Sequence, residues 1–213
     1  MAIKGLSKMV VASGYAYDQA TKKVTYDAVS VQEKMTKYEA TPNFAEGDGL
    51  YGDNGLAESA PKDFTDGDLT IGTTELTQET SKMIYKINET TETIGDNTVK
   101  IVSYDKDTEG NVIGLGLIEE HQYNDVTYYK PIILPKIKFD VKEDSAETRG
   151  SSISWQTPEL TGKIMLSDLY KAPSGSDNGY NCPWKLEMEW VDTEQKALAN
   201  IKAWFEAHKK AGS

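Results

Sequence analysis

Apolar and polar residues alternate with a period of two along several stretches of this chain. Residues 136–141 read Lys-Ile-Lys-Phe-Asp-Val, and residues 184–190 read Trp-Lys-Leu-Glu-Met-Glu-Trp. Successive side chains of a β-strand point to opposite faces, so this period is typical of strands with one buried and one solvated face. We predict further strands over residues 23–26, 29–40, 68–72, 99–104, 112–120, 126–129, 151–156 and 162–166.

Short turn signals separate the predicted strands. They include Asp96-Asn97, Glu109-Gly110 and Asn124-Asp125, which are residue pairs common in turns. Strands joined by such turns favour an antiparallel sandwich or barrel-like fold over a parallel α/β sheet. We therefore predict one mainly β domain over residues 1–213.

Two segments have helical character. Residues 77–84 predict a short helix, and residues 193–209 predict a longer C-terminal one. Asp192 is the expected N-cap, with Gln195 completing a capping box. Apolar and aromatic residues then recur on one face, which should pack on the sheet: Ala197, Leu198, Ile201, Trp204, Phe205 and His208.

Charge and composition exclude several classes of function. The net charge is −11, and Arg149 is the only arginine, whereas proteins that bind nucleic acid need clustered positive charge. The single cysteine, Cys182, cannot form an internal disulfide. No apolar run approaches the roughly 18 residues needed to span a bilayer. We expect a soluble, unprocessed protein that folds in a reducing cytoplasm and contacts no membrane.

Arrangements typical of catalysis or of metal binding are not found in the sequence. His208 is interpreted as a partly buried structural residue, and His121 as a solvated residue near a turn. With Cys182, these two histidines are too few ligands for a usual zinc site. We expect no catalytic residues, no cofactor and no metal, so the chain is not predicted to be an enzyme.

Three local patterns resemble ligand sites but are better explained structurally. Residues 105–110 begin like an EF-hand loop, but the twelfth position is Gly116 instead of glutamate. The Gly114-Leu-Gly116 sequence lacks the third glycine of a dinucleotide fingerprint and precedes no helix. Asp63, Asp66 and Asp68 could hold calcium, but acids in a turn are usually only solvated.

One long polar segment covers about residues 41–62. It contains four glycines and two prolines, and loops of more than about 12–15 residues in a compact domain are usually functional or disordered. Leu50, Tyr51 and Leu56 are apolar residues in it that have no obvious internal strand to join. We predict a flexible loop whose apolar residues anchor it on a neighbouring molecule.

An ordered series of motifs resembles the major tail proteins of siphophages that infect Gram-positive bacteria. The series covers roughly residues 1–170. It consists of Leu50-Tyr-Gly-Asp-Asn-Gly-Leu-Ala-Glu-Ser59, Asp68-Leu-Thr-Ile-Gly72, Tyr128-Tyr-Lys-Pro-Ile-Ile-Leu-Pro-Lys-Ile-Lys-Phe139, Asp144-Ser-Ala-Glu-Thr148 and Thr157-Pro-Glu-Leu-Thr-Gly162.

This resemblance implies a virion structural protein of the tail tube, assembled in the host cytoplasm. Subunits of that family form hexameric rings that stack into a hollow tube, through which DNA passes as transient cargo. Other tail proteins, such as the tape measure and tail terminator, would be further partners. The loop contacts to a neighbouring subunit would involve Leu50, Tyr51, Leu56 and Phe64. The strands that we expect to line the lumen carry Glu33, Lys34, Lys37, Lys136, Lys138 and Asp140.

Two other readings compete with the tail-tube subunit. A β-sandwich binding module would recognise carbohydrate or a cell surface, with tyrosines and tryptophans as stacking platforms. Against it, Trp184, Trp190 and Trp204 lie on apolar faces that we expect to be buried in the core. An enzyme is the third reading, and the missing catalytic arrangements argue against it.

Overall fold

Eight strands form one large antiparallel sheet in the computed structural model of the chain. The structure describes residues 2–47, 49–52, 55–59, 62–141 and 157–210. In spatial order the sheet runs β4-β1-β11-β12-β13-β8-β5, and β16 pairs with β12 beside this path. The strands are β1 (Ala2–Ala12), β4 (Val29–Gln32), β5 (Met35–Phe44), β8 (Phe64–Thr73), β11 (Val112–Tyr123), β12 (Val126–Phe139), β13 (Glu159–Ile164) and β16 (Leu186–Glu187).

Four small two-stranded sheets and two helices complete the described fold. The small sheets are β2 (Ala16–Asp18) with β3 (Lys23–Thr25), β6 (Gly49–Gly52) with β7 (Gly55–Ser59), β9 (Asn88–Ile94) with β10 (Asn97–Ser103), and β14 (Tyr170–Lys171) with β15 (Tyr180–Asn181). The helices are α1 (Gln78–Ile84) and α2 (Glu194–Ala207). The predicted mainly β antiparallel fold with a short helix and a C-terminal helix is confirmed. The sheet is not a closed barrel, since no ladder joins β4 to β5 in the described part of the chain.

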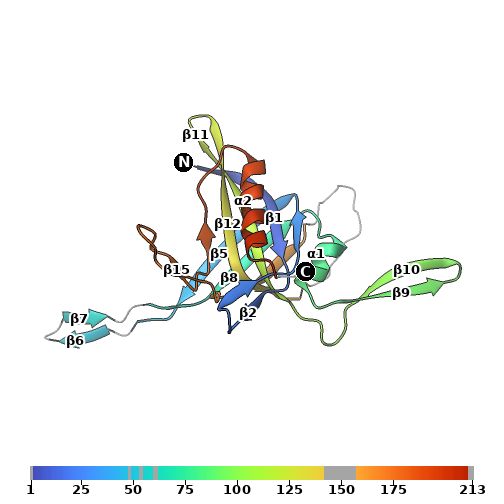
Figure 1. Cartoon of the computed structure of the whole chain (residues 1–213), viewed down its shortest axis with the longest axis horizontal. Coiled ribbons are helices and arrows are strands. Elements are labelled where there is room, and N and C mark those ends of the chain that lie inside the picture. Colours follow the sequence, from blue (N-terminus) through green and yellow to red (C-terminus); the bar gives the residue numbers. More distant parts are fainter. Residues whose placement is uncertain (1, 48, 53–54, 60–61, 142–156, 211–213) are drawn as a thin grey trace, which may run out of the picture.

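The large sheet is covered on both faces by apolar side chains. Along β1, Met9 and Val11 belong to one buried cluster, whereas Val10 and Ala12 belong to a second. The first cluster also contains Ile113, Leu115, Leu117, Ile137 and Phe139. The second lies beneath α2, which runs alongside β12 in Figure 1. Strands covered on both faces read as continuous apolar runs without alternation, which explains why β1 was not predicted.

Helix α2 packs as its periodicity predicts. Ala197, Ile201 and Phe205 are buried, and Leu198 and Trp204 are partly buried beside them. The predicted N-cap was wrong by one residue, because the side chain of Thr193 accepts the hydrogen bond from Lys196 N–H. The helix ends in a backbone connection to β3, since Tyr26 N–H donates to the carbonyl of His208 over 2.9 Å.

Two glycines of β11 allow α2 to approach the sheet closely. A Cβ on Gly114 would lie 2.6 Å from Cε1 of Phe205, and one on Gly116 would lie 2.4 Å from Cγ2 of Ile201. Both distances are shorter than Cβ contacts found in proteins. The Gly-Leu-Gly sequence therefore serves helix packing, which is a structural role consistent with the rejection of a dinucleotide fingerprint.

Two predicted strand boundaries were wrong within the large sheet. The predicted strand 29–40 is interrupted between β4 and β5, where Lys34 has a φ of 61° and its carbonyl accepts from Thr74 N–H. Conversely, the predicted strands 126–129 and 136–141 belong to the single strand β12, which ends at Phe139. Pro131 pairs with Ile118 without ending the strand.

The segment with the clearest alternation forms very little strand. Of residues 184–190, only Leu186 and Glu187 pair, opposite Ile133 and Ile132 of β12. The N-terminal strand and the 88–94 strand were not predicted, and the predicted strand 151–156 lies outside the described residues. Among the described helices, neither is long and apolar enough to cross a membrane.

Candidate functional site

The predicted 41–62 loop is in part a β-hairpin. Strand β5 continues to Phe44, and beyond it β6 and β7 pair with each other. In Figure 1 this hairpin projects from the lower left of the core. Leu50 lies in β6 opposite Glu58, and Tyr51 lies opposite Leu56 of β7, so these predicted contact residues share one hairpin. The side chains of residues 48–61 lie outside the described part of the structure.

Phe64, the fourth predicted contact residue, lies at the root of this hairpin. It begins β8 and pairs with Phe44 at the end of β5. Its ring is perpendicular to that of Phe44, with centroids 6.0 Å apart, and it lies parallel to Trp184 at 5.5 Å. Phe64 and Trp184 are partly buried against the first core cluster. Phe64 therefore fixes the hairpin root to its own core, and a contact with a neighbouring subunit stays a prediction.

A second hairpin, the β9–β10 arm (residues 88–103), projects to the opposite side of the core (Figure 1). Residues 88–100 are all exposed, and the exposed fraction of the Ile94 side chain is 59%. An ion pair from Lys82 of α1 to Glu89 ties down the base, and Lys100 pairs with the same carboxylate from within the arm. The sequence signal missed here is the Thr- and Glu-rich run 89–93, whereas the predicted turn at Asp96-Asn97 lies within one residue of the observed one.

The residues predicted to line a lumen fall on separate parts of the sheet. Lys136 and Lys138 lie on β12, Lys37 lies on β5, and β13 and β8 separate these strands. The other three are Glu33 and Lys34 in the bend between β4 and β5, and Asp140 directly after β12.

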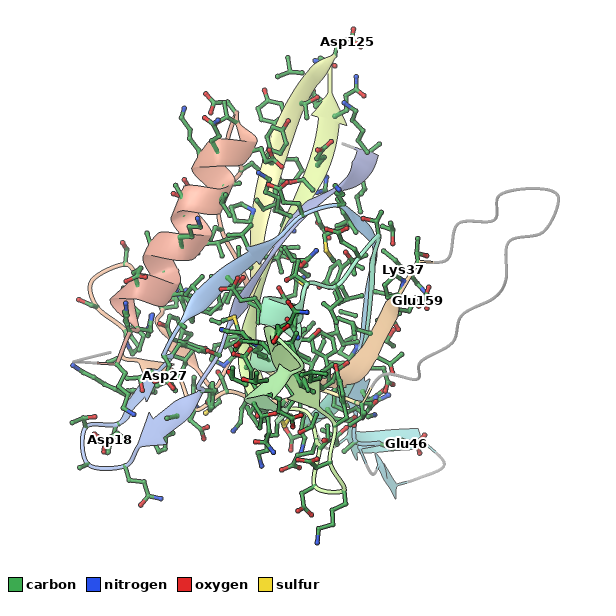
Figure 2. The ribbon with its side chains drawn as sticks, turned by 90° about the vertical axis from the view of Figure 1, so that its right-hand side faces the viewer. Asp18, Asp27, Lys37, Glu46, Asp125 and Glu159 are labelled. Carbon is green, nitrogen blue, oxygen red and sulfur yellow. The ribbon has the colours of Figure 1, made fainter. Side chains whose placement is uncertain are left out.

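Most of these charges already have partners within the chain. Lys136 bonds Asp168 over 2.8 Å, and Lys138 bonds Glu109 over 2.8 Å. The other pairs are Glu33 with Lys8 at 3.2 Å and Lys37 with Glu39 at 3.5 Å and Glu159 at 3.9 Å. Figure 2 shows Lys37 of β5 beside Glu159 of β13. Whether these residues face a lumen stays a prediction.

The prediction for His121 was wrong. Its exposed fraction is 7%, because its ring packs against Trp190 with centroids 4.4 Å apart. The Nε2 atom lies 3.2 Å from a carboxylate oxygen of Glu119. His208 is partly buried, as predicted, with Nδ1 2.8 Å from the carbonyl oxygen of Trp204. Neither arrangement contains a nucleophile, and each histidine has a structural partner.

Two of the three acidic residues considered for calcium, Asp66 and Asp68, are paired with other groups. Lys163 lies 2.9 Å from Asp66 and 2.7 Å from Asp68, and Asn43 donates to both carboxylates. The Lys163 ammonium, with help from Asn43, holds the pKa of both carboxyls below their usual range. In the described part of the chain, no group of three or more His, Cys, Asp or Glu side chains is placed to hold a metal ion.

The EF-hand-like segment likewise forms a structural connection. Hydrogen bonds from Lys138 and Lys86 lower the pKa of Glu109 to about 2. Asp105 accepts a hydrogen bond from Asn88 at the base of the β9–β10 arm over 2.7 Å. The segment thus connects the arm to β11 and β12.

A groove of about 690 Å³ opens between the β2–β3 hairpin, β14–β15 and the end of α2. We call it the lysine groove, because Lys22, Lys23, Lys209 and Lys210 line it and Asp18 is its only carboxylate among the described lining residues. Tyr17 and Tyr170 are also part of its lining, and they are 40% and 61% exposed. Sequence reasoning missed the groove, because its lysines come from opposite ends of the chain.

These features define a mainly β protein with two projecting hairpins and a cationic groove. No model of a known protein family matches the chain, and a search of curated proteins finds no match. The functional interpretation therefore depends on the surfaces of this chain and on the resemblance of its motif series.

Proposed function

We propose that this chain is a structural subunit of a phage tail tube, which assembles into stacked hexameric rings and conducts DNA. The observation that carries this proposal is the pair of hairpins, β6–β7 and β9–β10, which leave the core on opposite sides (Figure 1). A two-stranded hairpin is marginally stable in water unless it packs against other structure. Hairpins that extend beyond their own core are explained if copies of the chain cover them.

The open strand edges support the same proposal. Each strand of the β9–β10 arm pairs only with the other in the described structure, so its second edge has free backbone groups. Such edges favour pairing with another chain. Contacts that run head to tail between copies close into rings when the rotation allows, and rings can stack. The motif series that resembles siphophage major tail proteins supports this geometry.

The charge of the chain suits a conduit. A net charge of −11 with a single arginine repels a DNA backbone. At physiological ionic strength this repulsion reaches only about 8 Å. The residues that line the lumen therefore determine whether the tube wall repels the DNA. In this proposal those residues are Glu33, Lys34 and Lys37 near the β4–β5 bend, with Lys136, Lys138 and Asp140 at the end of β12. They include four lysines, and the carboxylates paired with Lys37, Lys136 and Lys138 offset that positive charge. The tape measure and tail terminator would be partners, and the mature location would be the virion tail.

A non-catalytic binding module is the alternative, and the exposed Tyr17 and Tyr170 beside the lysine groove are the observation that favours it. Trp184 and Trp204 favour it less, since they pack against the two core clusters. The core position predicted for Trp190 was wrong, because its side chain is 36% exposed and lies against His121. Negative-stain electron microscopy of the concentrated chain distinguishes the two functions. The proposal expects rings or tubes. A monodisperse particle that binds oligosaccharide would replace it with the alternative.

A further inference from the structure

We propose that the β9–β10 arm of one copy docks in the lysine groove of a neighbouring copy. This inference rests on the proposed function, because it names the contact that would join subunits. It concerns a different hairpin from β6–β7, which the sequence resemblance already implicates. The partner is a second copy of this chain.

The arm has features of a segment that gains its stability from a partner. Residues 88–100 are exposed along both strands, including Ile94 and Val99, whose side chains are 59% and 36% exposed. A ribbon of two strands without a covered face is marginal in water. Its base is nevertheless fixed, through Glu89 and through the hydrogen bond from Asn88 to Asp105. The arm is therefore held in place at its root and presents an uncovered outer half.

The outer half of the arm is acidic. Glu92 and Asp96 lie toward its tip and make no ion pair within the described structure. The lysine groove offers the opposite charge through Lys22 and Lys23, whereas Lys209 lies 4.0 Å from a carboxylate oxygen of Glu206. Lys22 and Lys23 likewise make no ion pair with described residues. In a chain of net charge −11, this groove is a place where a second acidic copy meets attraction instead of repulsion.

The groove also fits the apolar part of the arm tip. Leu169 is buried at its floor, and Tyr17, Tyr170 and Tyr180 line its walls. A side chain such as that of Ile94 can lose water against these rings while the carboxylates reach the lysines. Interfaces commonly combine an apolar centre of this kind with a charged rim.

The arm of a molecule points away from the groove of that molecule. In Figure 1 the arm extends to the right, whereas β2 and β15 lie to the left of α1. In Figure 2 the arm points toward the viewer, and Asp18 at the tip of the β2–β3 hairpin lies at the lower left edge. Complementary surfaces on different sides of a subunit produce a head-to-tail contact, which propagates into a ring or a filament.

Charge exchange between the two surfaces tests the inference. The arm variant carries Glu92→Lys with Asp96→Lys, the groove variant carries Lys22→Glu with Lys23→Glu, and a third chain carries all four changes. Sedimentation velocity measures the protein concentration at which each full-length chain assembles. We expect each reversed pair to raise this concentration on the order of tenfold or more. The chain with all four changes should assemble at close to the wild-type concentration, because opposite charges again face each other.

A matched control changes charge elsewhere by the same amount. Glu75→Lys with Asp107→Lys adds the same positive charge as the arm variant, at exposed positions outside the arm and the groove, and should leave assembly nearly unchanged. Circular dichroism checks that every variant is folded.

Three outcomes would overturn the inference. The first is arm and groove variants that assemble at the wild-type concentration. The second is a chain with all four changes that assembles no better than the arm and groove variants. The third is a groove that binds DNA through Lys22 and Lys23 while assembly stays unchanged. If the variants assemble normally, or if the groove binds DNA, the tail-tube function can still hold. A wild-type chain that never assembles would rule out both the tail-tube function and the contact between arm and groove.

Discussion

Phe64 lies flat against Trp184, with ring centroids 5.5 Å apart and an angle of 6° between the ring planes. The two residues come from distant parts of the sequence, and both contact the first core cluster. This stack lies where β5 and β8 leave the large sheet toward the β6–β7 hairpin. The direction in which that hairpin projects therefore depends on a contact within the core.

Replacing Phe64 by alanine should destabilise the fold. The half-buried ring would leave a gap beside Trp184, and we expect the free energy of unfolding to fall by about 2 kcal/mol, less than for a fully buried phenylalanine. Urea denaturation followed by tryptophan fluorescence measures this change. Phe44→Ala is the matched control, because that side chain is 49% exposed, and should cost less than about 1 kcal/mol. Equal losses for the two variants would show that the stack does not stabilise the hairpin root.

Gly116→Ala should loosen helix α2. The new methyl group would lie 2.4 Å from Cγ2 of Ile201, so the helix must shift, at a cost of about 1–3 kcal/mol. Hydrogen exchange should become faster in residues 194–207, together with a lower unfolding midpoint. Gly5→Ala is the control, since its new methyl group would lie 3.9 Å from the nearest atom, a carboxylate oxygen of Glu120. Equal hydrogen exchange and equal unfolding midpoints for Gly116→Ala and Gly5→Ala would show that Gly116 is not needed for the close approach of α2.

Sequence periodicity predicted which faces of strands are buried better than it predicted pairing. Ile137 and Phe139 alternate with lysines and are buried, as expected. In residues 184–190 the same alternation places Trp184 against the first core cluster and Leu186 against the second. Only Leu186 and Glu187 join a ladder, although Met188 N–H still donates to the carbonyl of Pro131 in β12. Alternation reports the environment of side chains, whereas hydrogen bonding depends on which strand lies alongside.

Features that depend on distant contacts could not be predicted from local patterns. His121 is buried because Trp190 packs on it from another part of the chain. The lysine groove brings Lys22 and Lys23 to Lys209 and Lys210 only because Tyr26 and His208 join through their backbones. Residues 9–12 are apolar on both sides because two cores meet at β1, and this pattern gives no alternation to detect.

Glu109 should contribute acid-sensitive stability. Hydrogen bonds from Lys138 and Lys86 lower its folded pKa from 4.5 to about 2. A depressed pKa gives stability that is present above pH 4.5 and is lost as the pH falls toward 2. We expect Glu109→Gln to be less stable than wild type at neutral pH, with a difference that shrinks as the solution is acidified through this window.

Urea midpoints of wild type and variant at successive pH values measure that difference. Glu92→Gln on the exposed arm is the control and should show little difference at any pH. A gap between wild type and Glu109→Gln that stays constant down to the lowest pH would contradict the assigned ion pairs.

Shortening the β6–β7 hairpin should separate folding from assembly. We would replace residues 47–61 by a Gly-Asn turn, which keeps the Phe44–Phe64 pair and the hydrogen bond from Ala45 N–H to the carbonyl of Asp63. Circular dichroism and thermal unfolding should stay close to wild type, because the contacts at the hairpin root are kept. Electron microscopy should show no tubes. A shortened chain that still forms tubes would remove the assembly role predicted for Leu50, Tyr51 and Leu56.

In the proposed function, copies of this chain complete the strand edges that one copy leaves open. Hydrogen–deuterium exchange of the full chain can be compared between dilute and concentrated protein. We expect amides of the β9–β10 arm and the β6–β7 hairpin to become protected at the concentration where rings or tubes appear. Unchanged exchange in both hairpins at every concentration, with the protein remaining monomeric, would contradict the proposed function.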